Sequence, residues 1–171
     1  AAGGVVVDNS SAFRGDESVP LVIPEVNGSM LEGFEGPGII ANPNCSTIIA
    51  LMAVHRIHRL AGIRSMSVST YQSVSGAGGA AMMELERQVG EHARGESPTV
   101  EALPSQALFN VFCHESAIGP DGFNEEERKM RTEGRRILAA PDMSVAATCV
   151  RVGVPRAHAM AIELELERSL A

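Results

Sequence analysis

Short apolar and β-branched runs that end at turn residues recur along this chain, and such runs predict β-strands. The predicted strands and extended segments are, in chain order, Val5–Asp8, Pro20–Val26, Gly38–Ala41, Arg64–Val74, Val145–Val154 and Ala159–Glu167. Within the last segment three apolar residues alternate with three glutamates, namely Ile162, Leu164 and Leu166 with Glu163, Glu165 and Glu167. This alternation predicts a strand with one buried face and one face in solvent.

Three longer segments carry apolar residues at helical spacing. Ser46–Leu60 is the first, and its expected apolar face consists of Ile48, Leu51, Met52, Ile57 and Leu60. Ala80–Ala93 is the second, and a glycine-rich turn, 75–79, precedes it. Asn124–Ala139 is the third, with Asn124 as the expected N-cap and acidic residues in its first turn. The segment 96–110 contains two prolines and is expected to be irregular.

This order of elements predicts an α/β plus α+β protein, in which the end of an α/β domain precedes an α+β domain. We place residues 1–43 in the first domain and residues 44–171 in the second. The chain opens on a loop that enters a predicted strand and closes just after another strand. We therefore expect both ends to be cuts within a longer protein.

Composition and charge narrow the possible partners. The 171 residues carry a net charge of −7 without a basic cluster, so nucleic acids and anionic membranes are poor partners. No apolar run approaches the ~20 residues that a membrane helix needs. The three cysteines, Cys45, Cys113 and Cys149, form an odd and widely spaced set, which is not a disulfide framework. A reducing cytoplasm is therefore the expected setting.

Cys45 stands where a predicted strand ends and a predicted helix begins. Main-chain N–H groups at a helix N-terminus stabilise an anion, so they favour a thiolate and could also hold an oxyanion. Position alone leaves a second interpretation open, because a free cysteine is commonly a buried structural residue.

The residues around Cys45 carry a family resemblance. The run Asn42-Pro43-Asn44-Cys45-Ser46-Thr47 resembles the active-site segment of aspartate-semialdehyde dehydrogenases, and the segments 7–14, 68–78 and 147–152 match that family in order. The resemblance implies a Rossmann-like nucleotide domain followed by a mixed-sheet catalytic and dimerisation domain of the glyceraldehyde-3-phosphate-dehydrogenase-like type. It also implies a homodimer or homotetramer.

The resemblance implies a reaction as well. The family reduces L-aspartyl 4-phosphate with NADPH to L-aspartate 4-semialdehyde and phosphate, in the biosynthesis of lysine, threonine, methionine and diaminopimelate. A cysteine thiolate displaces phosphate, and the resulting thioester accepts a hydride because sulfur donates little to the carbonyl. Cys45 matches that cysteine, and NADP is the implied cofactor.

Substrate-binding and acid–base roles are carried over position by position. His158 follows Arg151 by seven residues, as the family's acid–base histidine follows its substrate-binding arginine. By resemblance, Arg151 grips the substrate α-carboxylate with two parallel hydrogen bonds, and His158, which titrates near neutrality, takes the thiol proton. Gln72 matches the substrate-orienting glutamine. Without the resemblance, an arginine and a histidine at a strand edge indicate only a solvated surface pair.

Ligands for the phosphate, the ammonium group and the cofactor are also implied. Glu126 matches the residue that contacts the substrate ammonium, and Lys129 and Arg14 match two phosphate-binding residues. Taken alone, Glu126 and Lys129 would be an exposed ion pair one helical turn apart. Ser75 and Gly76 match a loop that lies against the cofactor, where glycine permits close approach of the backbone.

Asn44 and a histidine pair have more than one interpretation. The Asn44 side chain could cap the following helix, line the oxyanion site, or do both. His55 and His58 stand three residues apart on a predicted helix, but the sequence offers no third ligand, so no metal is expected.

The chain departs from the family pattern at two residues and in one missing motif. Gly153 stands where the family often has proline and Pro155 where a larger apolar residue is common, which reshapes the turn before His158. No G-x-G-x-x-G pattern follows a strand, so most of an NADP site is missing and we expect this segment alone to be inactive. The alternative function is a non-catalytic dimerisation or interaction module, which should have lost its site residues first.

Overall fold

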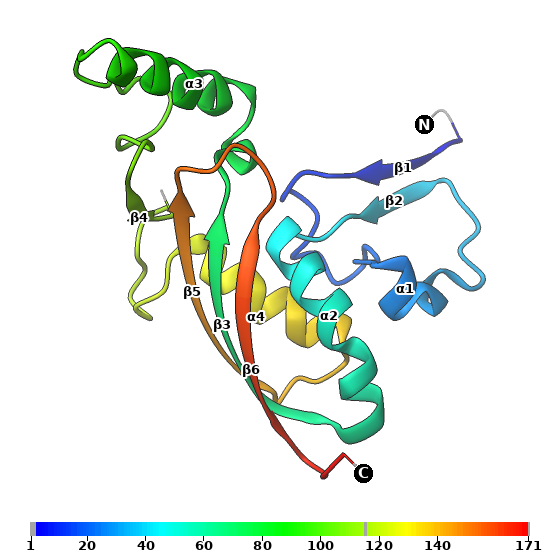
Figure 1. The fold of residues 1–171 in the computed structure, drawn as a ribbon. Helices are drawn as coiled ribbons and strands as arrows, with labels where there is room; N and C mark the ends of the chain where they lie inside the picture. The colour runs from blue at the N-terminus through cyan, green and yellow to red at the C-terminus, as the bar shows by residue number, and fades with distance from the viewer. Residues whose placement is uncertain (1–2, 115, 171) are drawn as a thin grey trace. The chain divides into compact units, whose positions relative to one another are not determined.

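The computed structural model describes residues 3–114 and 116–170 (Figure 1). The chain forms two compact units. The first unit comprises Ala1–Ser67, Arg128–Ala146 and Ile162–Ala171, and the second comprises Val68–Glu127 and Ala147–Ala161. The domain boundary between residues 43 and 44 stays a prediction.

A parallel pair of strands opens the first unit. β1 (Val5–Asp8) pairs with β2 (Gly38–Ala41), with Val5 opposite Gly38 and Asp8 opposite Ala41. Both strands have their predicted bounds. Leu21 makes a further parallel bridge to Ala41. Parallel neighbours need a crossover connection, which is typical of α/β structure.

The connection between these strands corrects one prediction. In the segment Pro20–Val26, which was expected to be extended, Leu21 makes a strand bridge, but Pro24–Asn27 forms the short helix α1. Proline at the first helical position has a φ that already suits a helix. Asn27 Oδ1 also accepts a hydrogen bond from Ile23 N at 2.8 Å, which closes the turn. The 3-10 helix η1 (Gly28–Leu31) follows.

Helix α2 (Cys45–Ala61) confirms the helix predicted after β2. It ends before Gly62, whose φ of 67° is readily adopted only by glycine. The predicted apolar face is partly wrong, because Met52 and Leu60 are 39% and 70% exposed. The residues that α2 buries are Ser46, Thr47, Ala50, Leu51, Val54, His55 and Ala61. The buried face is therefore rotated relative to the predicted one and includes small and polar residues.

A second sheet has four strands in the order β4-β5-β3-β6 (Figure 1). Three of these strands were predicted, and each predicted strand was one residue longer than the observed one. The observed strands are β3 (Ile63–Gln72), β5 (Ser144–Val152) and β6 (Ala159–Leu166). β4 (Val111–Cys113) was not predicted and pairs antiparallel with β5. Beyond β3, the 3-10 helix η2 (Val74–Ala77) replaces the predicted end of the strand and the start of the flexible turn.

The core of the first unit is apolar and draws on helices and strands distant in sequence. Its buried members are Leu21, Ile23, Val26, Ala41, Leu51, Val54, Ile63, Met66, Ile137, Leu138, Met143 and Val145. Ile162, Leu164 and Leu166 of β6 pack against this core. The intervening residues Glu163 and Glu165 are exposed, which confirms the predicted alternation.

The second unit holds an irregular segment in place with buried polar side chains. Helix α3 (Gly79–Ala93) presents Glu84, Gln88 and Glu91 towards residues 96–110, and all three are buried. Gln88 Oε1, for example, accepts hydrogen bonds from Ala107 N at 3.1 Å and Leu108 N at 3.0 Å. The predicted irregular segment is therefore ordered by side-chain to main-chain bonds in place of a sheet ladder.

Helix α4 (Glu125–Ile137) begins with a reciprocal cap. Glu127 N donates to Asn124 Oδ1 and Asn124 N donates to Glu127 Oε2, each at 2.9 Å, which is the capping-box arrangement. The predicted N-cap is confirmed. The parallel pair and the larger sheet with its helices also confirm the α/β plus α+β fold class. Within the described ranges, no helix combines the length and apolarity required to cross a membrane.

Candidate active site

Cys45 is the first residue of α2, and its side chain is exposed. Asn44 precedes it with extended backbone angles, φ −61° and ψ 142°. Asn44 Oδ1 accepts hydrogen bonds from Ser46 N at 3.0 Å and Thr47 N at 3.2 Å. The side chain of Asn44 is thus the helix cap. Because these two N–H groups are engaged by the cap, they are not available to an oxyanion, and the amide nitrogen of Asn44 is the end of this side chain that could donate.

A buried carboxylate from α4, Glu133, fixes the same helix start. Asn44 N donates to Glu133 Oε2 at 2.7 Å, and Glu133 is 4% exposed. In a capping box the acceptor for the N-cap N–H is a Glu or Gln three residues later, but that position in α2 is Thr47. Glu133 supplies the missing carboxylate from another helix. We call Arg14, Asn44, Cys45 and Glu133 the thiol cluster.

Arg14 is held at the thiol cluster by its polar neighbours. Its Nε donates to Asn42 O at 2.8 Å and its Nη2 donates to Asn9 O at 3.0 Å. Nη1 lies 3.8 Å from Glu133 Oε1. A guanidinium held in this way is a pre-oriented anion ligand. Lys129, the second residue expected to bind phosphate, lies on α4 and is half-buried.

Arg151 and His158 meet around Ser73 in the second unit. Arg151 is 1% exposed, and its Nη1 donates to Ser73 O at 2.9 Å. His158 Nδ1 accepts from Ser73 N at 3.0 Å and lies 2.9 Å from Ser73 Oγ. A Cβ added to Gly76 would lie 3.2 Å from both Arg151 Nη1 and His158 Nε2. We call Ser73, Gly76, Arg151 and His158 the histidine cluster. The solvated surface pair is excluded for Arg151, because its side chain is buried.

The surroundings of His158 disfavour its charged form. Burial lowers the pKa of His158 below its ordinary value of 6.5, and the positive charge of Arg151 lowers it further. Glu126 acts in the opposite direction with a smaller effect. The expected titration near neutrality is therefore moved to lower pH, which favours the neutral form of His158.

Gln72 and Glu126 also come together in the second unit. Both are buried, and Gln72 Nε2 donates to Thr70 Oγ1 at 3.2 Å and to Glu126 Oε1 at 3.3 Å. His114 Nε2 lies 3.9 Å from Glu126 Oε2. Glu126 is thus not an exposed helix carboxylate. His114 and Glu133 were missed from the sequence. Glu133 does carry a weak signal, since it follows Glu126 by seven residues and so lies on the same face of α4.

The turn expected to lie against a cofactor is η2. Val74 N donates to Val154 O at 2.9 Å and Ser75 N donates to Pro155 O at 3.1 Å. Pro155 takes part in the bond to Ser75 N only through its main-chain carbonyl oxygen. The replacement of a larger apolar residue by proline at this position therefore does not remove the hydrogen bond. Gly76 is exposed. A flat ring could therefore approach the main chain at Gly76.

The His55 and His58 rings are each engaged by main-chain atoms of the first unit. His55 is buried, with Nδ1 lying 3.2 Å from Leu51 O and 3.1 Å from Met52 O. His58 Nδ1 accepts a hydrogen bond from Ile63 N at 3.2 Å. The His55 ring thus contacts the middle of α2, and the His58 ring binds the residue that follows the helix end. Among the residues that the structure describes, no group of three or more metal-ligating side chains converges.

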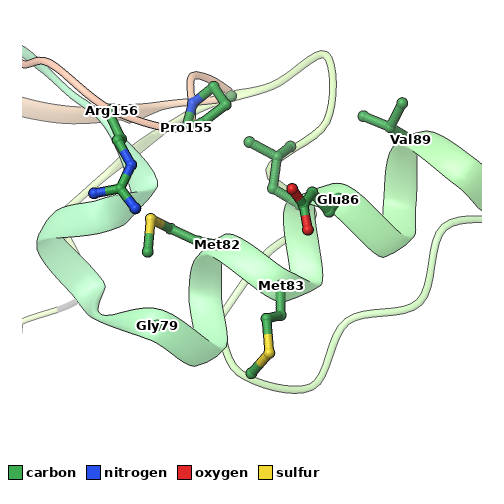
Figure 2. A pocket seen from close by; sticks show the side chains of 9 residues that line it. Gly79, Met82, Met83, Glu86, Val89, Pro155 and Arg156 are labelled. Atoms are coloured by element: carbon green, nitrogen blue, oxygen red, sulfur yellow. The ribbon is translucent and has the colours of Figure 1, made fainter.

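An apolar groove of about 520 Å³ runs along α3 in the second unit (Figure 2). Figure 2 shows Met82 and Met83 on the helix, with Pro155 and Arg156 on the facing turn. The residues that line the groove are Gly79, Met82, Met83, Leu85, Glu86, Val89, Gly153, Pro155 and Arg156. This set contains none of the predicted site residues.

Comparison with known proteins supports the fold. Residues 54–171 match the family model described as semialdehyde dehydrogenase, dimerisation domain. An aspartate-semialdehyde dehydrogenase of Synechocystis sp. is 49% identical over 164 residues, which is 96% of this chain and 48% of that protein. Its counterpart from Aquifex aeolicus is 45% identical over 170 residues, or 99% of this chain and 50% of that protein. The chain thus spans about half the length of these curated relatives.

Solved structures of aspartate-semialdehyde dehydrogenases are also similar to this chain. The crystal structure of aspartate semialdehyde dehydrogenase II from Vibrio cholerae complexed with ASA has a TM-score of 0.92 and 40% identity, covering 96% of this chain and 49% of that one. The Candida albicans structure with NADP, at 22% identity and a TM-score of 0.69, supports the fold alone. The predicted fold, with a mixed-sheet dimerisation domain of the glyceraldehyde-3-phosphate-dehydrogenase-like type, is confirmed.

Proposed function

Because this chain belongs to the aspartate-semialdehyde dehydrogenase family, we propose that the whole protein reduces L-aspartyl 4-phosphate to L-aspartate 4-semialdehyde with release of phosphate. The observation that carries the proposal is the exposed thiol of Cys45 at the capped start of α2. The proposal places the protein in the synthesis of lysine, threonine, methionine and diaminopimelate, in the cytoplasm. The dimerisation-domain match supports a homodimer or homotetramer.

Cys45 is the nucleophile in this proposal. A thiolate is the attacking species, and the acyl phosphate carbon becomes a thioester carbon as phosphate leaves. Arg14 and Lys129 bind the leaving phosphate, because cations stabilise the charge that develops on it. The contact of Arg14 with Glu133 orients the guanidinium but partly neutralises its charge. Lys129 therefore adds positive charge that the leaving phosphate needs.

The second unit binds the amino-acid end of the substrate. The buried guanidinium of Arg151 takes the α-carboxylate, and its bond to Ser73 O fixes the plane in which it binds. Glu126 takes the ammonium group, and Gln72, which already contacts Glu126, orients the substrate. His158 is the acid–base group of the carried-over scheme. Asn44 lines the oxyanion site through its amide nitrogen while Oδ1 caps α2.

NADPH is the proposed reductant and supplies a hydride to the thioester when bound. Ser75 and Gly76 fit the nicotinamide end, because the exposed glycine lets a ring approach the main chain. The sequence holds no glycine-rich phosphate-binding pattern, so the rest of the cofactor needs residues outside this chain. We therefore propose that residues 1–171 alone do not turn over.

Replacement of the nucleophile tests the proposal. In the full-length protein, Cys45→Ser should lower kcat by well over about tenfold, because a serine hydroxyl does not ionise near neutrality. Cys113→Ser is a matched control, since Cys113 is also exposed, and it should keep wild-type turnover. Activity is read as phosphate-dependent reduction of NADP with the semialdehyde. A Cys45→Ser protein that keeps a tenth of the activity would rule out the covalent route through Cys45.

A further inference from the structure

We propose that Glu133 is a positioning residue with two tasks in the thiol cluster. Its hydrogen bond to Asn44 N fixes the start of α2, where Cys45 stands, and its negative charge weakens the binding of phosphate by Arg14. The second task rests on the proposed function, because that function assigns phosphate to Arg14. The first task rests on the geometry of the first unit, which contains all four residues.

The main-chain N–H of Asn44 needs an acceptor inside the protein. Asn44 is 6% exposed, and an N–H group that is buried without an acceptor destabilises a fold. Glu133 Oε2 accepts from Asn44 N at 2.7 Å, a short distance that is typical of a charged acceptor. Asn44 Oδ1 is already engaged by the N–H groups of Ser46 and Thr47. The N-cap residue is therefore held by α2 at its side chain and by Glu133 at its main chain, and Cys45 follows it directly.

Helix α4 also holds the segment that carries Arg14. Arg136 follows Glu133 by three residues, so the two side chains leave the same face of α4. Arg136 Nη1 donates to Arg14 O at 2.8 Å, and Arg136 Nη2 donates to Val19 O at 2.6 Å. Glu133 therefore faces an arginine whose main chain is fixed by the next turn of the same helix.

The contact between Glu133 and the Arg14 guanidinium acts mainly through charge. Arg14 keeps its orientation through Nε and Nη2, which donate to Asn42 O and Asn9 O. Arg14 Nη1 lies 3.8 Å from Glu133 Oε1, and within residues 3–114 and 116–170 it makes no hydrogen bond. The Arg14 and Glu133 side chains are 12% and 5% exposed, so solvent screens their interaction little. A phosphate on Nη1 would meet the carboxylate as a like charge.

This arrangement suits an anion that must leave the site. Phosphate is the leaving group of the proposed reaction, and a nearly buried arginine without an opposing charge would retain it after the acyl transfer. The Glu133 carboxylate offsets part of the attraction between Arg14 and phosphate. The hydrogen bonds to Asn42 O and Asn9 O meanwhile keep the guanidinium oriented. Orientation and affinity are thus set by different partners of Arg14.

Phosphate kinetics of the full-length protein test the effect of the charge. Glu133→Gln keeps an oxygen that can accept from Asn44 N but has no charge. In phosphate-dependent reduction of NADP with the semialdehyde, we expect the KM for phosphate to fall by roughly three- to tenfold, because the repulsion between the carboxylate and the anion is lost. The KM for the semialdehyde should stay near its wild-type value. A variant that only damaged the structure would not bind phosphate more tightly.

A matched control separates this effect from the loss of any carboxylate. Glu25→Gln removes an exposed negative charge from α1 of the same unit, and its KM for phosphate should equal that of the wild type. An unchanged or higher KM for phosphate in Glu133→Gln would overturn the inference, and so would an equal fall in Glu25→Gln.

Amide hydrogen exchange of the full-length protein tests the bond to Asn44 N. Glu133→Ala removes the acceptor, so we expect the Asn44 amide to exchange at least about tenfold faster. Glu133→Gln should bring the exchange rate back near the wild-type value. An alanine variant that exchanges as slowly as the wild type would overturn the inference.

The outcomes distinguish this inference from the proposed function. Activity retained in Cys45→Ser would reject the proposed function, and the phosphate task of Glu133 would be rejected with it, but the bond to Asn44 N would not. An inactive Cys45→Ser protein, together with no fall in the KM for phosphate in Glu133→Gln, would reject the inference and leave the dehydrogenase proposal intact.

Discussion

The thiol cluster and the histidine cluster are built in different ways. The centre of the thiol cluster follows from local sequence, because Asn44 caps α2 through the N–H groups of Ser46 and Thr47, only two and three residues away, although Glu133 reaches Asn44 N from a distant part of the chain. The histidine cluster depends on pairing across the chain, since Ser73 and His158 are 85 positions apart. A local cap keeps its geometry whenever its helix forms, whereas a long-range cluster needs the whole unit in place. Small changes should therefore disturb the histidine cluster more.

The largest effect after loss of the nucleophile is expected from Arg151→Lys in the histidine cluster. Lysine keeps the charge but loses the planar fork, so it cannot hold a carboxylate by two parallel bonds and also donate to Ser73 O. The loss of one charged hydrogen bond, about 1.5–3 kcal/mol, corresponds to a roughly ten- to a hundredfold rise in KM for the semialdehyde. Steady-state kinetics of the full-length protein measure it. A near-normal KM would mean that the carboxylate is bound elsewhere.

Gly76→Ala probes how tightly the histidine cluster is packed. The new Cβ would lie 3.2 Å from Arg151 Nη1 and from His158 Nε2, so at least one of these groups must shift. A small displacement of reacting groups is costly, and we expect kcat/KM to fall by roughly tenfold. Gly79→Ala is the matched control, because nothing lies within 4 Å of a Cβ there. Equal activity in the two variants would show that the histidine cluster tolerates movement. It would then be no more sensitive to small changes than the thiol cluster.

Elements that depend on local sequence were predicted, whereas elements and contacts that depend on distant residues were missed. β1, β2 and α2 were predicted almost to the residue, because their apolar runs end at turn residues and a cap. β4 was missed because its three residues gain their conformation by pairing with β5. Glu133 was missed because its partner, Asn44 N, is 89 positions away and belongs to the main chain. A main-chain N–H is present at almost every residue, so it does not show in the sequence which distant side chain binds it.

The family resemblance supplied what periodicity could not. It selected Gln72, Glu126, Arg151 and His158, four residues that the structure then places in the second unit. One contact among them, Gln72 with Glu126, is present, and Arg151 and His158 both bind Ser73. The buried state of Arg151 and Glu126 was not visible in the sequence, since charged residues are mostly exposed. Burial is decided by the strands and helices that surround them.

The smallest expected effect concerns Asn44, and it can separate the two roles given to this residue. Asn44→Ala removes the acceptor for Ser46 N and Thr47 N, and loss of an N-cap lowers the free energy of unfolding by about 1 kcal/mol. Asn44→Ser restores a capping oxygen but has no amide nitrogen. If Asn44 is only a cap, the serine variant should recover both thermal stability and kcat. If the amide also lines the oxyanion site, serine should recover stability while kcat stays as low as in the alanine variant. Thermal unfolding and kcat measured on the same three proteins decide between these outcomes, and we expect the second, because Oδ1 is occupied by the cap and the donor end of the side chain has a separate task.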